Sequence, residues 1–325
     1  MAIQWPFLMD GDDVVGLDIG ERSVSAVRLR VQPKGSWEVR NAGVLELAPG
    51  AADQDVAHVI HTLWRQNGMV CNNVCTCLRS PALLVRHFSY PPLTDEELPS
   101  VLRLAVEEEL QMPADQFYLD WHLFGRTGLP ASRSQEGPTE GFLVAVPKKD
   151  AQRHLDLLAA TGLHAVILDV GCTAMANLYL TLRGVRHAGE AVCLVKLQEH
   201  GVDLALLNGN YFLYPRSIYS PTQPWVQVLD RLVENIRNEL KYFEFKLLQH
   251  PVQKVVLMGP AALDRHVVEH LQETLALPVE PWDPRQDPCF HVTRAARAAW
   301  QETAHGSLSV MSLCLALRTG YHGLF

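Results

Sequence analysis

The residues best suited to chemistry lie near the start of the chain, in the run Leu17-Asp18-Ile19-Gly20-Glu21-Arg22-Ser23. Asp18 follows an apolar β-branched segment and precedes a glycine turn, so its carboxylate could hold a hydrated Mg²⁺. The backbone amides of the turn around Gly20, with the Ser23 hydroxyl, could approach phosphate oxygens. The alternative is a plain hairpin in which the aspartate accepts hydrogen bonds from the turn amides. Spacing alone favours that alternative.

Other candidate sites in the sequence have simpler structural explanations. Asp169 and Thr173 also fit an Asp-x-Gly-x-Thr pattern, but this pattern leads directly into a helix, which either side chain is expected to cap. Cys71, Cys75 and Cys77 do not have the spacing of paired zinc knuckles, and small core residues are the simpler interpretation. The sequence contains no His-Glu-x-x-His, Gly-x-Ser-x-Gly or Walker motif.

Composition predicts an ordinary soluble protein of about two domains. The chain has 325 residues, 48% of them hydrophobic and 20% charged, and a formal net charge of −8. The best candidate for a basic cluster is the single pair Lys148-Lys149, which argues against nucleic acid as the main partner. No apolar run reaches the ~18–20 residues that span a bilayer, and the first ten residues do not resemble a signal peptide. Seven scattered cysteines favour reduced thiols in the cytoplasm.

The elements that must position these residues alternate between strands and helices. Thr94 and Glu97 have the spacing of a capping box, whereas Pro99 favours a helix that begins at the proline itself. A polar loop is expected over 125–141. The first half is predicted to contain strands over 14–20, 24–31, 37–47, 74–78, 83–88, 117–123, 142–146 and 165–169, and helices over 53–67, 98–110, 150–160 and 172–182.

The second half follows a linker over 184–190 and opens with strands again, so the two halves look like a loose repeat. The sequence Asn208-Gly209-Asn210 predicts a hairpin turn. One long amphipathic helix is predicted over 226–248, ended by Pro251. The remaining predicted elements are strands over 191–197, 202–207, 211–218, 254–258 and 277–280, and helices over 264–275 and 307–317.

An Asp-x-Gly-x-x-Ser hairpin followed by a second strand-rich half resembles the actin-like ATPase fold. More narrowly, the chain resembles the PilM family of type IV pilus assembly proteins. The resemblance spans most of 14–182 and is traceable, more weakly, to Leu317. It rests on the order and spacing of the hairpin at 15–30, YPPLTDEEL at 90–98, AVEEELQMP at 105–113, VAVPK at 144–148, and the run 155–177 with its ATGL.

The resemblance implies an α/β, two-lobed actin-like ATPase (ribonuclease H-like) fold with a small inserted subdomain. The first lobe would comprise 12–90 and 142–185, and the inserted subdomain 91–141. The second lobe with the terminal helix would comprise 190–325, with that helix near the hinge between the lobes. Nucleotide would lie between the lobes, its phosphates held by one hairpin from each.

The second lobe departs from the family pattern. Lys196 stands where the family has its second carboxylate, and Gln198 where it has a glycine. Lysine cannot ligate Mg²⁺, although it can neutralise a phosphate as a point charge. The family's Gly-Gly pair near the adenosine is Gly259-Pro260 here, which removes one backbone donor. The segment 218–226 is also short for a nucleobase pocket. These departures argue against ATP hydrolysis and leave, as candidate ligands of ATP and Mg²⁺, Asp18, Gly20, Ser23, Lys196 and Gly259.

The resemblance implies a cytoplasmic scaffold of a type IV pilus assembly machine. It would bind the N-terminal cytoplasmic peptide of an inner-membrane partner resembling PilN, in a groove between the first lobe and the inserted subdomain. It would link the membrane platform to the cytoplasmic motor ring, reach the membrane only through its partner, and bind no nucleic acid. The alternatives are a functional ATPase or small-molecule kinase, which Lys196 opposes, or a component like the cytoplasmic part of a type II secretion system. A filament-forming protein resembling FtsA is a further alternative, although the chain does not end in a basic amphipathic helix.

Overall fold

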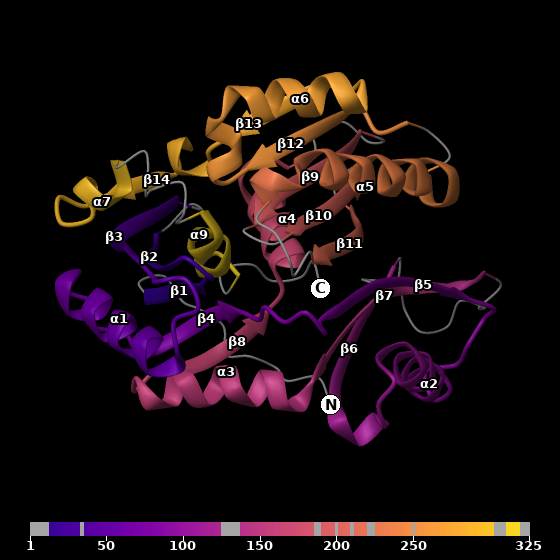
Figure 1. Cartoon of the computed structure of the whole chain (residues 1–325), viewed down its shortest axis with the longest axis horizontal. Helices are drawn as coiled ribbons and strands as arrows, with labels where there is room; N and C mark the ends of the chain where they lie inside the picture. The colour runs from indigo at the N-terminus through magenta and orange to yellow at the C-terminus, as the bar shows by residue number, and fades with distance from the viewer. Residues whose placement is uncertain are drawn as a thin grey trace.

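The computed structural model describes residues 13–32, 36–124, 137–184, 190–198, 201–208, 211–219, 225–248, 251–301 and 310–318. Within these residues the chain forms three β-sheets with helices packed between and around them (Figure 1). The α-helices are α1 (Asp53–Gln66), α2 (Leu98–Leu110), α3 (Lys148–Ala160), α4 (Gly171–Leu182), α5 (Leu229–Tyr242), α6 (Arg265–Leu275), α7 (Arg297–Gln301) and α9 (Val310–Ala316). Shorter helical turns are η2 (Ala114–Gln116), η3 (Trp225–Gln227), η4 (Phe243–Leu248), η5 (Pro260–Leu263) and η6 (Pro284–Gln286).

The first sheet has the order β14-β3-β2-β1-β4-β8 and places the N-terminal hairpin at its centre. Alternation along β1 sends Val15 and Leu17 toward α1 and α3, while Val14 and Asp18 face the opposite side. Gly16 lies on that opposite side and meets α9 directly, because an added Cβ would lie 1.9 Å from the Ser312 carbonyl oxygen. The strands are β1 (Asp13–Ile19), β2 (Ser23–Gln32), β3 (Ser36–Glu46), β4 (Asn73–Cys77), β8 (His164–Asp169) and β14 (Phe290–Val292).

The second sheet has the order β11-β10-β9-β12-β13. Its strand β9 alternates in the same way: Cys193 and Val195 pack against α5 and α6, while Val192 and Leu194 face the core that contains α4 and α9. Lys196 shares the face of Val192 and Leu194 and therefore points toward the first sheet. The strands are β9 (Ala191–Gln198), β10 (Gly201–Asn208), β11 (Tyr211–Tyr219), β12 (Lys254–Met258) and β13 (Val279–Trp282).

A small third sheet carries α2 on one face and touches both larger units. Its order is β5-β7-β6, with β5 (Leu84–Tyr90), β6 (Phe117–Leu123) and β7 (Thr139–Pro147). Leu98, Leu102 and Val106 of α2 pack against Phe88 and Leu143 of this sheet. Strand β5 contacts β11 of the second sheet, and α3 follows β7 at once into the first unit (Figure 1). The sheet thus includes strands on both sides of the 91–141 segment, and the division of the chain into lobes stays a prediction.

Most predicted elements form at the expected places, but one helix prediction was wrong. The segment 226–248, predicted as one helix, instead forms η3, then α5, then the π-helical segment η4. The spacing of apolar residues does not reveal such a change of helix type, so the prediction missed it. Both signals before α2 operate: Thr94 and Glu97 exchange hydrogen bonds of 2.9 and 3.2 Å through their side chains and amides, and the helix then begins at Leu98 with Pro99 in its first turn. Strand β14 and α7 were not predicted. Four predictions fall on residues outside the described part of the chain: the 125–136 part of the loop, 185–189 of the linker, Gly209-Asn210 of the turn, and the start of the last helix.

Candidate functional site

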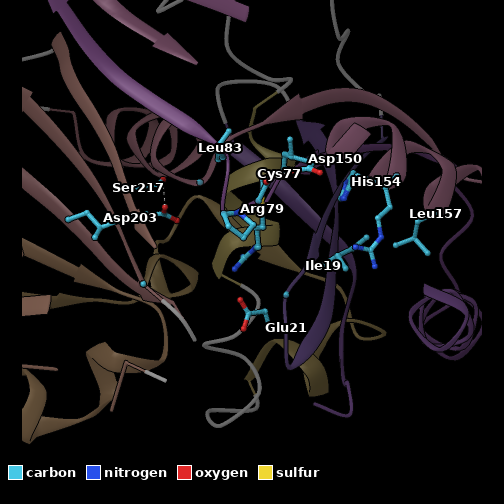
Figure 2. A pocket seen from close by; sticks show the side chains of 18 of the residues that line it. Ile19, Glu21, Cys77, Arg79, Leu83, Asp150, His154, Leu157, Asp203 and Ser217 are labelled. Carbon is cyan, nitrogen blue, oxygen red and sulfur yellow. Dashed lines mark hydrogen bonds between the residues drawn. The ribbon is translucent and has the colours of Figure 1, made fainter. Parts of the chain in front are cut away.

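The carboxylate of Asp18 is paired with an arginine from the neighbouring strand. Because β1 and β4 are parallel, with Leu17 opposite Thr76, their carboxyl ends meet at one edge of the sheet. Arg79 follows β4 at that edge, and its Nη2 lies 2.7 Å from Oδ1 of Asp18. Burial disfavours the charged guanidinium, but the Asp18 carboxylate outweighs this and raises the pKa of Arg79. The two side chains, 25% and 10% exposed, form a shielded ion pair. Arg79 of this pair lines the cleft and lies near its centre in Figure 2.

A thiol completes the shell of Asp18. Sγ of Cys77 donates to Oδ1 of Asp18 across 3.5 Å. Burial, with the Asp18 charge, raises the pKa of Cys77 and keeps the thiol protonated as a donor. One oxygen of Asp18 therefore already accepts from a guanidinium and a thiol.

Lys196 lies in the same inter-sheet space with no direct counter-ion. The residue is 7% exposed, and its aliphatic chain passes 3.6 Å from the position a Cβ would take on Gly259. Its backbone pairs with Asp203 of β10 and Met258 of β12, and no direct ion pair of its ammonium group is found among the described residues. Burial first, and the Arg79 charge second, lower the pKa of Lys196, while Asp18 and Asp203 oppose that shift. These four charges therefore act on one another between the first and the second sheet.

Asp203 is the direct cross-strand partner of Lys196, and its charge opposes the lowering of the Lys196 pKa. Asp203 is 2% exposed, and its Oδ1 accepts a hydrogen bond of 2.6 Å from Ser217 on β11. Its Oδ2 lies against Gly171, the first residue of α4, where a Cβ would come within 2.3 Å. The N-terminus of a helix carries partial positive charge, which favours a carboxylate there. Asp203 is thus stabilised by α4 and Ser217.

The predicted phosphate turn is closed on itself. The Gly20 amide donates to the Ser23 carbonyl across 2.8 Å, so this amide is used within the turn. Gly20 lines the cleft beside Glu21. Of the five predicted nucleotide residues, Gly20 lines the cleft, and Ser23 ends the same turn. The charges of Asp18 and Lys196 act on each other, whereas Gly259 lies beside the Lys196 chain and lines a second cavity.

The cleft has a volume of about 350 Å³ and further polar groups on its α3 side. Oγ1 of Thr76 and Nε2 of His154 lie 3.1 Å apart, and Ser80 donates to Asp150 across 2.5 Å. Burial lowers the pKa of His154 to about 4, so the imidazole is neutral at physiological pH. Arg153 and Asp53 form a two-bond ion pair of 2.8 and 2.9 Å at the rim. Each group is thus paired within the protein.

The described residues do not fit a bound Mg²⁺. The ion needs several oxygen ligands in near-octahedral arrangement, whereas one oxygen of Asp18 is engaged by Arg79 and the second carboxylate position is Lys196. Two cations stand where a divalent ion would be held. The remaining carboxylate, Asp203, is occupied by Ser217 and α4.

Sequence reasoning missed Arg79 and Asp203, although each left a signal. Arg79 follows an apolar strand that was itself predicted, but its place beside Asp18 depends on the parallel pairing of β1 with β4, which is not local. Asp203 is an acid inside the apolar run Val202–Leu207, opposite Lys196 in the predicted hairpin. A charged residue facing another across two buried strands is a signal for a buried polar site.

The other candidates take structural roles. Oδ1 of Asp169 accepts a hydrogen bond of 2.8 Å from the Val170 amide and bonds to Thr173, while Oδ2 pairs with Arg318 after α9 at 2.8 Å. The capping prediction was wrong in detail, because Val170 is the N-cap residue of α4 and no side chain caps the helix. Cys75 and Cys77 are buried in β4. Among the described residues no group of three or more His, Cys, Asp or Glu side chains is arranged to hold a metal ion. No helix in that part of the chain is long and apolar enough to cross a membrane.

A separate groove runs along the small sheet where it meets α3. It has a volume of about 380 Å³ and is lined by residues of β6, by Arg103 of α2 and by Lys148 of α3. Tyr118 on β6 is 50% exposed, and Nζ of Lys148 lies 5.5 Å from the centroid of its ring. Among the described residues β6 pairs only with β7, so its outer edge has backbone groups open to a further strand.

Comparison with known proteins identifies the fold and the family. The family model described as "Type IV pilus assembly protein PilM" matches residues 16–219. A solved PilM-PilN type IV pilus biogenesis complex is similar over 96% of this chain and 99% of that chain, with a TM-score of 0.77 and 21% identity. A Bacteroides thetaiotaomicron protein with actin-like ATPase fold and unknown function is similar over 83% and 91%, with a TM-score of 0.50 and 8% identity. No curated protein matches the sequence. The chain therefore has the actin-like ATPase fold expected from its sequence.

Proposed function

The chain belongs to the PilM family of type IV pilus assembly proteins, and from that membership we propose that it is a scaffold that holds a membrane partner by a peptide. The partner is an inner-membrane protein resembling PilN, whose N-terminal cytoplasmic segment docks on the small sheet. The scaffold thereby lies in the cytoplasm at the inner membrane face, reaches the membrane through this partner, and links it to the cytoplasmic motor ring.

The observation that carries this proposal is the groove beside β6. An extended peptide that adds to an unpaired strand edge gains main-chain hydrogen bonds, while neighbouring pockets select its side chains. Here the edge of β6 is flanked by Tyr118 and Trp121, with Arg103 and Lys148 on the rim. Exposed aromatic rings beside a strand edge are suitable anchors, because a buried aromatic side chain contributes more to binding than most others. This groove between α3 and the α2 unit is the one that we propose for the docking site implied by the family resemblance.

The cleft between the sheets supports a structural role for the nucleotide site. An ATPase of this fold needs a divalent ion on its carboxylates, and here Arg79 and Lys196 supply fixed positive charge instead. Asp18, Gly20, Ser23, Lys196 and Gly259 remain the residues that we propose to face any bound nucleotide, and hydrolysis is not part of the proposed function.

The proposal is tested with a synthetic peptide of the N-terminal segment of the PilN-like protein from the same organism. Its affinity for the full chain is measured by fluorescence anisotropy. Tyr118→Ala should weaken binding at least tenfold, since truncation of an anchoring aromatic side chain costs about 2 kcal/mol. Tyr242→Ala removes a similarly exposed tyrosine from α5 and should leave the affinity unchanged. If Tyr118→Ala does not change the affinity, or if both variants lower it equally, the peptide does not dock in the groove beside β6.

A further inference from the structure

Asp120 places a carboxylate on the outer edge of β6. The Phe124 amide donates to the Glu140 carbonyl of β7 across 2.9 Å. Because successive amides of a strand point to opposite sides, the amide of Trp121, three residues earlier, points away from β7 and toward the open edge. Its partner there is Oδ1 of Asp120, at 2.9 Å. The Asp120 side chain thus occupies a backbone donor that an added strand would use.

The two faces of β6 differ in polarity. Leu119 and Trp121 pack against the apolar core that α2 covers, whereas Tyr118 and Asp120 alternate onto the opposite face and are exposed. Nζ of Lys148 lies 5.5 Å from the centroid of the Tyr118 ring, and Tyr118 precedes Asp120 by two residues, about 7 Å along the strand. Asp120 has no ion pair with any residue in the described ranges. Its negative charge is therefore open to an ion pair with a bound segment.

We propose that the groove beside β6 selects an extended segment with a lysine or arginine opposite Asp120. The incoming strand bonds one of its own carbonyls to the Trp121 amide and thereby releases the Asp120 carboxylate. The residue of the segment that lies opposite Asp120 shares its face of the sheet, and opposite charges in such a pair stabilise it. A segment without this basic residue leaves the released carboxylate without a partner. This selection rests on the proposed docking of the partner's peptide and specifies the charge of that peptide at one position.

A double-mutant cycle between the full chain and the peptide of the PilN-like partner tests this selection. Each lysine or arginine of the peptide is changed in turn to glutamine, and the affinities for the wild type and for Asp120→Asn are measured by fluorescence anisotropy. Asparagine keeps an oxygen for the Trp121 amide and removes the charge. At one basic position, Asp120→Asn should weaken the unchanged peptide about threefold and the glutamine peptide not at all, as for an exposed ion pair. Asp115→Asn, which removes a carboxylate of η2 from the same groove, should show no such coupling.

Hydrogen exchange of the Trp121 amide, followed by NMR, tests the edge contact without any peptide. Asp120→Ala removes the acceptor and should speed exchange of this amide about threefold after correction for the intrinsic rate. Unchanged exchange, or peptide binding in which no basic position couples to Asp120, overturns the selection while the docking site stands. If coupling is absent and Asp120→Ala dimerises in analytical ultracentrifugation, the edge instead binds a second copy of the chain. An absence of peptide binding to the wild type overturns the docking and the selection together.

Discussion

At the scale of single residues, burial decides the ionisation of the cleft. Cys77 and His154 are both held neutral by burial, and each then serves as a hydrogen-bonding partner, to Asp18 and Thr76 respectively. Arg79 stays charged because Asp18 lies beside it. Neutral and charged groups therefore lie together near the end of β4.

His154 should make the protein sensitive to acid. Its pKa is lowered from 6.5 to about 4, so the unfolded chain takes up a proton before the folded chain does. The contribution of neutral His154 to the free energy of unfolding is therefore fully present above pH 6.5. It falls by about 3 kcal/mol in total as the pH drops to 4. His154→Gln keeps a side chain able to bond Thr76 and should remove most of this dependence in urea unfolding at pH 7, 6, 5 and 4.

The control for this prediction is a histidine on the surface. His58→Gln changes an exposed residue of α1 and should leave the acid dependence as it is. If the wild type and His154→Gln lose stability in parallel between pH 6.5 and 4, the acid sensitivity comes from other groups.

At the scale of elements, the contact of β1 with α9 holds the centre of the molecule. Gly16 allows the helix backbone to approach so closely that an added Cβ would lie 1.9 Å from the Ser312 carbonyl oxygen and 2.4 Å from the Ala316 amide nitrogen. Both atoms belong to backbone, which cannot rotate aside. Ser25 of β2 donates to Ser312 across 3.2 Å at the same contact. Strand β1, which carries Asp18, is thus held in place against α9.

Gly16→Ala should therefore destabilise the protein by about 3 kcal/mol or more, at the upper end for overpacked cores, since either β1 or α9 must move. The midpoint of urea unfolding measures this loss. Gly137→Ala is the matched change, because its added Cβ meets nothing within 4 Å. A similar small effect in both variants would mean that β1 and α9 separate easily.

Tyr214 should prove important for the attachment of the small sheet to the second sheet. Its ring lies 4.6 Å from that of Phe243 and 5.8 Å from that of His87 on β5, centroid to centroid. Tyr214→Ala should cost about 3 kcal/mol and speed hydrogen exchange of the β5 amides. Tyr118→Ala, at a half-exposed position, should do neither. Unchanged exchange in β5 would mean that the sheet is held by other contacts.

The sequence predicted individual residues of the site better than it predicted which of them lie close together. Asp18 was singled out because it ends an apolar strand beside a glycine turn, and Lys196 because it stands where the family resemblance implies a carboxylate. Arg79 was missed, since only the parallel pairing of β1 with β4 brings it to Asp18, and such pairing depends on the whole fold. The change of helix type at Phe243 was missed because the apolar spacing over 226–248 is compatible with both helix types.

At the scale of the whole molecule, the end of the described chain ties the two halves together. Nε of Arg318, just after α9, lies 2.8 Å from Oδ2 of Asp169, which is itself 8% exposed at the start of α4. Arg318→Met should cost about 2 kcal/mol, below the range for fully buried pairs because a quarter of the arginine side chain is exposed. Arg265→Met, from an exposed pair on α6, should leave the melting temperature unchanged. An equal response in both would assign no special role to the chain end.

The charged residues between the first and the second sheet also decide which ion can be held there, and this preference should be reversible by substitution. In Arg79→Ser combined with Lys196→Asp, two cations are removed and a carboxylate is added, so Asp18, Asp203 and the new carboxylate repel one another across the cleft. That variant should be less stable than the wild type in EDTA. It should recover a higher melting temperature in millimolar Mg²⁺, because like charges around one space create the oxygen-rich site that the ion prefers. The wild-type melting temperature should be indifferent to Mg²⁺.

Arg153→Ser with Lys254→Asp changes the same residue types at the rim and surface and should gain no response to Mg²⁺. If the melting temperature of Arg79→Ser with Lys196→Asp does not depend on Mg²⁺, these two residues do not set the ion requirement of the cleft.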